Sequence, residues 1–263
     1  MTGRKHPFWL AVARRVQSRM AARGDLLAGL LASLLSSAAG PVVVLTLFRQ
    51  VPTLHGWTGP EVLFCWGFAD AVSGAFNALF GGLYVLNRRY VLGGELDRVL
   101  LRPMDPYVQV MLDNLSLEDI PAFGLGLAMM GVAGAWGLPA IPLWRLGLLP
   151  LALLSGVAVL AGVITTFASM GFLLLHRGTA VGMASQLSTF ARYPLDLFGA
   201  PLRWLLTTAL PFGFAGFYGA ILVLGSERWQ GIALLQPLVG ALVLALGYGA
   251  FRLGLRRYGS AGS

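Results

Sequence analysis

Long apolar runs without any charge dominate the chain. Residues 26–48 and 146–176 contain no Asp, Glu, Lys or Arg. A helix needs about 20 apolar residues to cross a bilayer, and one charge at its centre costs about 2.5–3.5 kcal/mol. The weak alternation that is typical of a membrane-spanning β-barrel is missing from these runs. The pattern therefore predicts a polytopic, helical membrane protein.

The apolar runs divide into six predicted transmembrane helices, at residues 26–48, 62–87, 120–144, 147–176, 179–200 and 232–253. A further apolar segment, 201–225, is interrupted by prolines, glycines and an arginine. Broken backbone persists at membrane depth only against protein or water, so we expect a re-entrant pair of short helices on the outer side; a seventh span is the alternative. The expected fold is all-α, with an N-terminal segment (1–25), one transmembrane domain (26–255) and a cytoplasmic tail (256–263).

Basic residues are distributed unevenly between the two sides of this topology. With the N-terminus inside, most of the 19 Lys and Arg residues lie on the inner side; the exceptions are Arg49, Arg145, Arg192, Arg203 and Arg228. Such an excess marks the cytoplasmic side, so both termini are expected in the cytoplasm. The net charge of +8 is then a topology signal. We expect no nucleic-acid partner, because the basic residues follow the membrane edge instead of forming one patch.

The N-terminal residues carry both basic and apolar side chains. A cleaved signal peptide is not expected, because the apolar run after the basic region is a full transmembrane length. We interpret residues 7–23 as a helix on the inner membrane surface, with apolar and basic residues largely on opposite faces. Its predicted interfacial residues are Trp9, Val12, Arg15, Val16 and Arg19. The alternative is a plain basic anchor before the first span.

Motifs for catalysis or nucleotide binding are missing from the sequence. Cys65 is the only cysteine, and the three histidines are scattered, so neither a disulfide nor a metal site is expected. The P-loop, HExxH, GxSxG and GxGxxG patterns do not occur. We therefore expect no catalytic residues in this chain, and its energy must come from a gradient or from another subunit.

A few charged and polar residues fall within the predicted spans. Asp70 lies in the middle of the second span, with Asn77 nearby, and an ionisable residue at that depth is a candidate functional group. Arg192 and Asp196 are spaced to pair at i and i+4. These four residues are our candidates for a transport pathway. For Asp70 and for the Arg192–Asp196 pair, the alternative is structural ion pairing.

The segment 88–119 is the largest hydrophilic stretch between spans. Gly93-Gly94 is expected to end the second span, ELDRVLLR to form a short helix, and Pro103 to stop it. A second short helix is expected at 107–115. Ser116 then resembles the N-terminal cap of the third span. A short, rigid, charged helix below the membrane is suited to docking another protein, whereas a solvated connector is the alternative.

Two stretches resemble the ABC-2 type transporter permeases, in the branch with six spans and no fused ATPase. GGELDRVLLRPMDPYVQ is similar to the signature loop of that family, and ARYPLDLFGAPLRWLLTTALPFGFAGFYGA, residues 191–220, is similar to its second signature. The resemblance extends over about residues 10–255. One departure is FYGA at 217–220, where many members have a proline before the alanine.

The resemblance implies that the chain pairs with a second permease, identical or similar, in the lipid bilayer above a dimer of cytoplasmic ABC ATPases. ATP and magnesium would bind to those ATPases and not to this chain. In such exporters a helix of the first cytoplasmic loop docks into the ATPase. Here the docking residues would be Glu95, Asp97, Arg98, Leu100, Leu101, Arg102 and Pro103.

The function implied is export of an amphipathic or hydrophobic substrate (a drug, lipid or peptide) across a bacterial cytoplasmic membrane. The many Ala, Gly, Leu and Arg residues, with a single lysine, favour a GC-rich bacterial source. Two alternatives are a gradient-driven carrier that uses Asp70 and, more remotely, a lipid-modifying enzyme. Such an enzyme would usually show clustered carboxylates and histidines near the interface.

Overall fold

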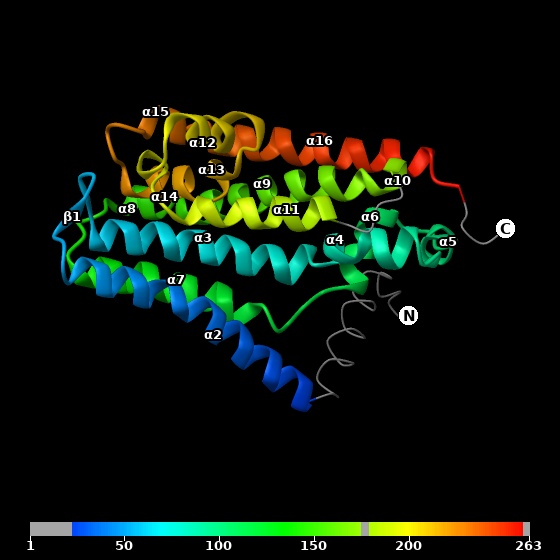
Figure 1. Cartoon of the computed structure of the whole chain (residues 1–263), viewed down its shortest axis with the longest axis horizontal. Coiled ribbons are helices and arrows are strands. Elements are labelled where there is room, and N and C mark those ends of the chain that lie inside the picture. Colours follow the sequence, from blue (N-terminus) through cyan, green and yellow to red (C-terminus); the bar gives the residue numbers. More distant parts are fainter. Residues whose placement is uncertain (1–22, 175–178, 260–263) are drawn as a thin grey trace, which may run out of the picture.

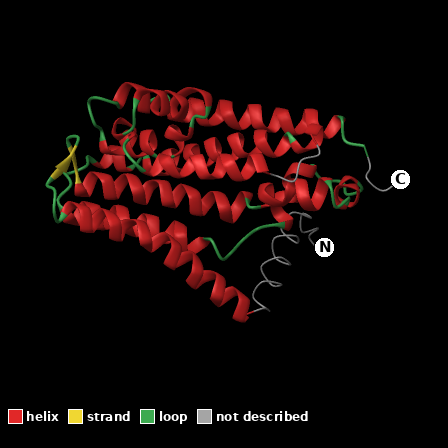
Figure 2. Ribbon diagram, viewed as in Figure 1, coloured by secondary structure: helices red, strands yellow, loops and turns green. Residues whose placement is uncertain are grey.

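The computed structural model describes residues 23–174 and 179–259 and is a bundle of helices (Figure 1). Apart from one two-stranded hairpin, regular structure in these residues is helical (Figure 2), so the all-α prediction is confirmed. The long helices, in chain order, are α2 (Arg23–Phe48), α3 (Gly59–Phe80), α7 (Ile120–Trp136), α9 (Leu149–Ser169) and α16 (Gln236–Arg256). The predicted N-terminal helix, with Trp9, Val12, Arg15, Val16 and Arg19, lies outside the described residues.

Shorter elements lie at the two ends of the bundle. One end carries the hairpin and a group of short helices; these are β1 (Thr53–Leu54), β2 (Trp57–Thr58), α8 (Leu143–Leu146), the 3₁₀ helix η3 (Leu195–Leu197), α12 (Ala200–Trp204), the π-helix η4 (Leu205–Ala209), α13 (Phe212–Ala215), α14 (Phe217–Leu224) and α15 (Gln230–Ala233). The other end carries α4 (Gly82–Val85), the π-helix η1 (Leu86–Val91), α5 (Glu95–Leu100), α6 (Pro106–Asp113) and α10 (Gly171–Leu174). We call these the hairpin end and the loop end.

Within the described residues, four helical segments are long and apolar enough to cross a membrane: Leu26–Phe48, Gly59–Phe80, Leu143–Ser169 and Gln236–Arg256. Six spans were predicted: four of the predicted ranges overlap these segments, and the other two fall on the shorter apolar helix α7 and on one broken segment, so six full spans are not confirmed. That segment is α11 (Thr179–Ser188), which continues as the 3₁₀ turn η2 (Thr189–Arg192). It breaks because Pro194 disfavours helical backbone at Tyr193, which is extended at φ −105° and ψ 151°.

The predicted third span is also shorter than expected. Helix α7 ends at Trp136 because Gly137 takes a positive φ of 126° and two prolines follow within 138–142. Its start differs as well: Asp119, not Ser116, occupies the N-cap position, and its side chain makes no capping hydrogen bond. The segment 201–225 forms several short helices instead of one pair, and α14 among them is almost entirely buried.

Helix α3 is the centre of the bundle and α2 is at its edge. In their apolar windows 72% of α3 is buried inside the protein, against 6% of α2. Around α3 lie α7, α9, α14 and η2, and the buried core combines residues from all of them. Helix α2 diverges from its neighbours towards the loop end (Figure 1). Most of its apolar surface is therefore available to lipid or to another chain.

Glycines permit the closest helix contacts within the chain. On α16, a Cβ at Gly247 would lie 2.8 Å from the Cα of Gly162 on α9, and would also collide with that residue's carbonyl oxygen. Gly126 of α7 meets the backbone of Ala71 on α3 in the same way. Small residues let membrane helices approach until their backbones touch. At these positions the small residues serve packing within one chain.

Adding a single methyl group at Gly247 is expected to destabilise the bundle. Gly247→Ala should lower the free energy of unfolding by about 1–3 kcal/mol, because backbone at Gly162 cannot move aside without separating the helices. Gly249→Ala is the matched control: it lies on the same helix, with nothing within 4 Å of its added methyl group. Thermal unfolding of the two variants in the same detergent measures the difference. Equal stabilities would contradict the packing role of Gly247.

Candidate functional site

Helix α5 forms at the loop end because glycine and proline bound it. Gly94 precedes the helix in the left-handed conformation, at φ 70°, which favours glycine. Leu96 and Val99 face the protein and are buried, whereas Leu100 is 44% and Leu101 86% exposed. Leu96 and Val99 therefore hold the helix to the bundle, whereas Leu100 lies outside this contact. The helix thus has one face fixed to the bundle and one apolar edge in the open.

Two ion pairs hold α5 to its neighbours. Arg89 of η1 contacts Glu95 at 2.7 Å, and Arg102, just after α5, contacts Asp113 of α6 at 3.4 Å. Both pairs are exposed, so each contributes at most about 1 kcal/mol. Their effect is to fix the direction of a six-residue helix. Two of the predicted docking residues, Arg98 and Pro103, are exposed beside them.

Asp105 connects this loop to the last long helix. Its carboxylate accepts hydrogen bonds from the backbone of Tyr107 and Val108, which caps α6. The other carboxylate oxygen accepts from the Tyr248 hydroxyl at 2.8 Å and from Arg252 at 3.4 Å, both on α16. The sequence analysis missed this residue, although Asp before Pro106 is the signature of a helix start. The contact to α16 has no signal in the sequence.

Truncating Asp105 is expected to loosen both attachments. Asp105→Ala should lower the free energy of unfolding by about 1–3 kcal/mol, since it removes the cap of α6 and leaves Tyr248 without its acceptor. Asp105→Asn retains a capping oxygen and should lose less than half as much. Thermal unfolding in detergent compares the two variants. If Asn and Ala prove equally destabilising, charge and not capping is what the site supplies.

Asp70 and Arg192 meet in the middle of the bundle. The Arg192 Nε lies 2.9 Å from an Asp70 oxygen, and the guanidinium lies over the Trp66 ring at 5.8 Å. Asp70 is almost completely buried, while the Arg192 side chain is 32% exposed. A buried carboxylate is tolerated in a membrane when a cation faces it. Two of the four predicted pathway residues therefore form one ion pair.

The expected Arg192–Asp196 pair is wrong. Asp196 instead accepts a hydrogen bond from Trp57 Nε1 at 2.8 Å and pairs with Arg228 at 3.2 Å, near the hairpin end. Side chains at i and i+4 face each other only along a continuous helix. The break at Pro194 removes that relation and sends the two charges to different neighbours.

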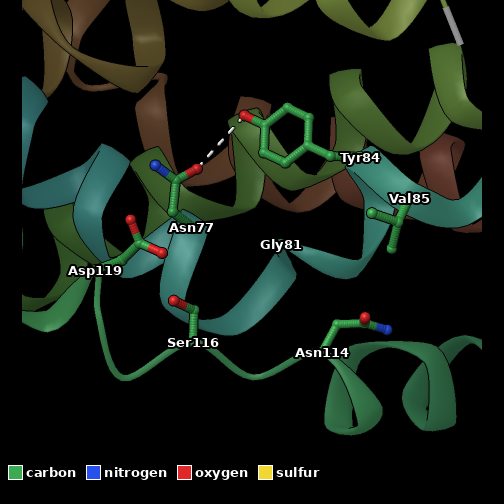
Figure 3. Close-up of a pocket in the computed structure, with 7 residues that line it drawn as sticks. All are labelled: Asn77, Gly81, Tyr84, Val85, Asn114, Ser116 and Asp119. Carbon is green, nitrogen blue, oxygen red and sulfur yellow. Dashed lines mark hydrogen bonds between the residues drawn. The ribbon is translucent and has the colours of Figure 1, made fainter. Parts of the chain in front are cut away.

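A polar cleft runs beside α3 from the Asp70–Arg192 pair towards the loop end. Figure 3 shows the residues of its wider part: Asn77 and Tyr84 point toward one another, and Asn114 and Ser116 lie on the segment that joins α6 to α7. The Tyr84 hydroxyl lies 3.4 Å from an Asn77 oxygen and 3.4 Å from the Ser185 hydroxyl of α11. Asn77 is thus the third predicted pathway residue that the structure places near the pair. The hydroxyl residues that α11 and η2 contribute to the cleft, Ser185, Ser188 and Thr189, were missed, because single hydroxyls in apolar helices are unremarkable in sequence.

Metal binding has no support in the described residues, which contain no group of three or more His, Cys, Asp or Glu side chains able to hold an ion. Cys65 is fully buried, and burial removes it from redox or ligand chemistry at the surface. The two notable features of the chain are therefore the exposed edge of α5 at one end and the polar cleft within the bundle.

Comparison with known proteins agrees with these features. A family model described as ABC-2 family transporter protein matches residues 34–262. No curated protein and no solved structure matches the chain. Members of this family are membrane transport components, generally not catalytic themselves, and they generally work with an ATPase partner. The match extends from the first long helix through the loop end to the tail, and the chain therefore belongs to the ABC-2 transporter family of membrane permeases.

Proposed function

We propose that this chain is the membrane subunit of an exporter driven by a separate ABC ATPase. A dimer of that ATPase binds ATP and magnesium in the cytoplasm, and this chain pairs with a second permease, identical or similar, in the bacterial cytoplasmic membrane. Both termini and the loop end then lie in the cytoplasm. The substrate is amphipathic or hydrophobic and moves outward.

The observation that carries this proposal is the construction of α5. Leu96 and Val99 pack against the bundle, and ion pairs of Arg89 and Arg102 fix the direction of the helix. Leu101 projects from the helix with 86% of its surface exposed. An exposed leucine among charged residues on a rigid helix offers an apolar contact within a polar rim, which is the arrangement of a protein interface. Charge around the leucine would orient a partner and the apolar contact would supply affinity.

The same loop is connected by hydrogen bonds to a transmembrane helix, so a movement of the loop would be transmitted to that helix. Asp105 lies a few residues beyond α5 and binds both α6 and α16. A rigid-body movement of the docked ATPase would therefore reach a transmembrane helix through one hydrogen-bonded side chain. Packed elements transmit such movements as rotations or translations of whole helices.

Co-purification tests the proposal. A tagged copy of the chain, extracted from its native membranes in mild detergent, should carry a stoichiometric second protein that contains a P-loop. A further permease in the same eluate would show a heterodimer. If the chain is recovered alone and still moves solute along a gradient in vesicles, it is a secondary carrier and the proposal fails.

A further inference from the structure

The polar cleft consists of two cavities that share Asn77 and Tyr84. The wider one, of about 400 Å³, lies at the loop end and is lined by Gly81, Val85, Asn114, Ser116 and Asp119 in addition to the two shared residues. The narrower one, of about 90 Å³, reaches inward to Arg192 between α3, α9 and α11. The two cavities adjoin at Asn77 and Tyr84, whose polar atoms lie 3.4 Å apart, and together they extend from the loop end to Arg192.

Polar residues on α3 follow this path. Asp70, Ser73 and Asn77 lie at i, i+3 and i+7, so they share one face over about 10 Å of helix. Ser73 and Asn77 are only half-buried, and Tyr84 beyond them is 40% exposed. Polar side chains at membrane depth face protein or a water-filled cavity. Ser73, Asn77 and Tyr84 are not enclosed by their own chain, which leaves room beside them for water, a polar ligand or the second permease.

Together with Asp70, the described residues that line the cleft carry a net negative charge. Arg192 is neutralised by Asp70 at its inner end. At the wide end, Asp119 contributes a carboxylate, and no basic residue of the described chain forms an ion pair with it. The remaining polar lining consists of hydroxyls and amides; among them, the Asn114 oxygen accepts a hydrogen bond from Arg89 at 3.5 Å, and Arg89 is itself paired with Glu95. The partly negative oxygens of the lining attract a cationic head whether or not it carries an N–H group. The Tyr84 ring adds an aromatic surface of the kind that attracts cations.

We infer that the cleft admits the positively charged head of an amphipathic substrate from the cytoplasmic side, while its apolar part stays among lipid or the apolar lining. Asp119 attracts the head at the mouth, and Asn77 and Tyr84 receive it further in. Phe76, Leu160 and Ile164 provide the apolar wall beside them. The inference rests on the proposed export function and narrows its substrate class to cationic amphiphiles.

Cysteine labelling in lipid nanodiscs tests the cleft directly, using the full chain with the proteins that co-purify with it. Ser116→Cys is treated in parallel with a trimethylammonium-bearing and a sulfonate-bearing methanethiosulfonate. The ratio of the two labelling rates, cationic over anionic, is divided by the same ratio for a free thiol in solution. The corrected ratio should be about ten, because one nearby carboxylate attracts the cationic reagent and repels the anionic one. Adding Asp119→Asn should return the corrected ratio to near one. A ratio unchanged by Asp119→Asn would overturn the inference.

Leu154→Cys is the control for mere exposure. Leu154 is 70% exposed on the apolar helix α9, so lipid should cover it and neither reagent should reach it. The native Cys65 is fully buried and gives the blank. If Leu154→Cys were labelled as rapidly as Ser116→Cys, the reagents would be reaching lipid-facing positions as well. Labelling at Ser116→Cys would then not show that the cleft is open to water, and the inference would fail.

A competition step tests the substrate class. Dodecyltrimethylammonium, below its micellar concentration, should slow the labelling of Ser73→Cys, deep in the cleft, by about tenfold once its concentration is about ten times its dissociation constant. Laurate has a chain of the same length with a carboxylate head and should leave the rate unchanged. Equal protection by laurate, or none by either, would overturn the inference. These labelling experiments use no ATP, so a negative result would contradict the cationic substrate class but not the proposed exporter. Conversely, the lack of an ATPase partner would contradict the exporter but not the labelling results.

Discussion

Leu101→Asp is expected to abolish ATP-driven export while the protein remains folded in the membrane. Leu101 is 86% exposed and lies outside the buried core, so its replacement should not affect stability. If it is the apolar anchor of a docked ATPase, a charge there should weaken binding by at least about 2 kcal/mol, or roughly thirtyfold. The quantities to measure are the amount of ATPase retained on the purified permease and ATP-dependent transport in proteoliposomes.

Leu143→Asp provides the matched control. Leu143 of α8 is also 86% exposed, but it lies at the hairpin end, opposite α5. It should therefore leave the ATPase bound in normal amount. Arg102→Glu, combined with Leu101→Asp, should further reduce the amount of ATPase that stays bound, since the new carboxylate also repels Asp113. Normal export by the Leu101→Asp/Arg102→Glu double variant would show that α5 is a solvated connector and not a coupling helix.

Arg192→Leu is expected to be the most destabilising of the substitutions considered. It leaves the Asp70 carboxylate buried without its cation, and breaking a buried pair in this way costs about 3–5 kcal/mol. Asp70→Leu combined with Arg192→Leu removes both charges and should recover most of that loss. A double-mutant cycle of unfolding free energies in detergent gives the coupling between the two residues.

The same cycle separates the exporter from a gradient-driven carrier. A carrier that used Asp70 would lose transport in Asp70→Leu/Arg192→Leu even though stability is recovered. An ATP-driven exporter in which the pair is structural should keep a substantial part of its transport. Recovered folding with complete loss of transport would make Asp70 a functional site and contradict the structural interpretation of the pair.

The loop end shows how far the sequence could be followed. Gly93-Gly94 and Pro103 were sufficient to predict a short helix at residues 95–102, and the structure has it at Glu95–Leu100, because backbone limits at glycine and proline act locally. The second short helix, α6, was also placed to within one or two residues. Which leucine faces solvent was not predictable. Leu96 and Leu100 lie on adjacent turns, and only packing against η1 and α6 decides that the first is buried and the second exposed.

The candidate pathway was predicted residue by residue but not as an arrangement. Asp70 was recognised from its depth in an apolar segment, with structural ion pairing as one interpretation, whereas Arg192 was expected to pair with Asp196. Their pairing requires η2 to lie against α3, 122 positions away in the chain. Asp119 and Tyr84 enter the cleft in a similar way, from segments that only the folded chain brings together.

By itself the sequence determined that this protein lies in a lipid membrane, that it is helical, which family its motifs resemble, and where the short helices of the loop 88–119 begin and end. These depend on hydrophobicity and on backbone preferences, which are properties of neighbouring residues. The tertiary structure alone decided that Asp70 pairs with Arg192, that glycines such as Gly247 join helices within one chain, and that polar residues from four segments line one cleft. Such contacts depend on how the helices are rotated and packed, and that is set by the whole bundle at once.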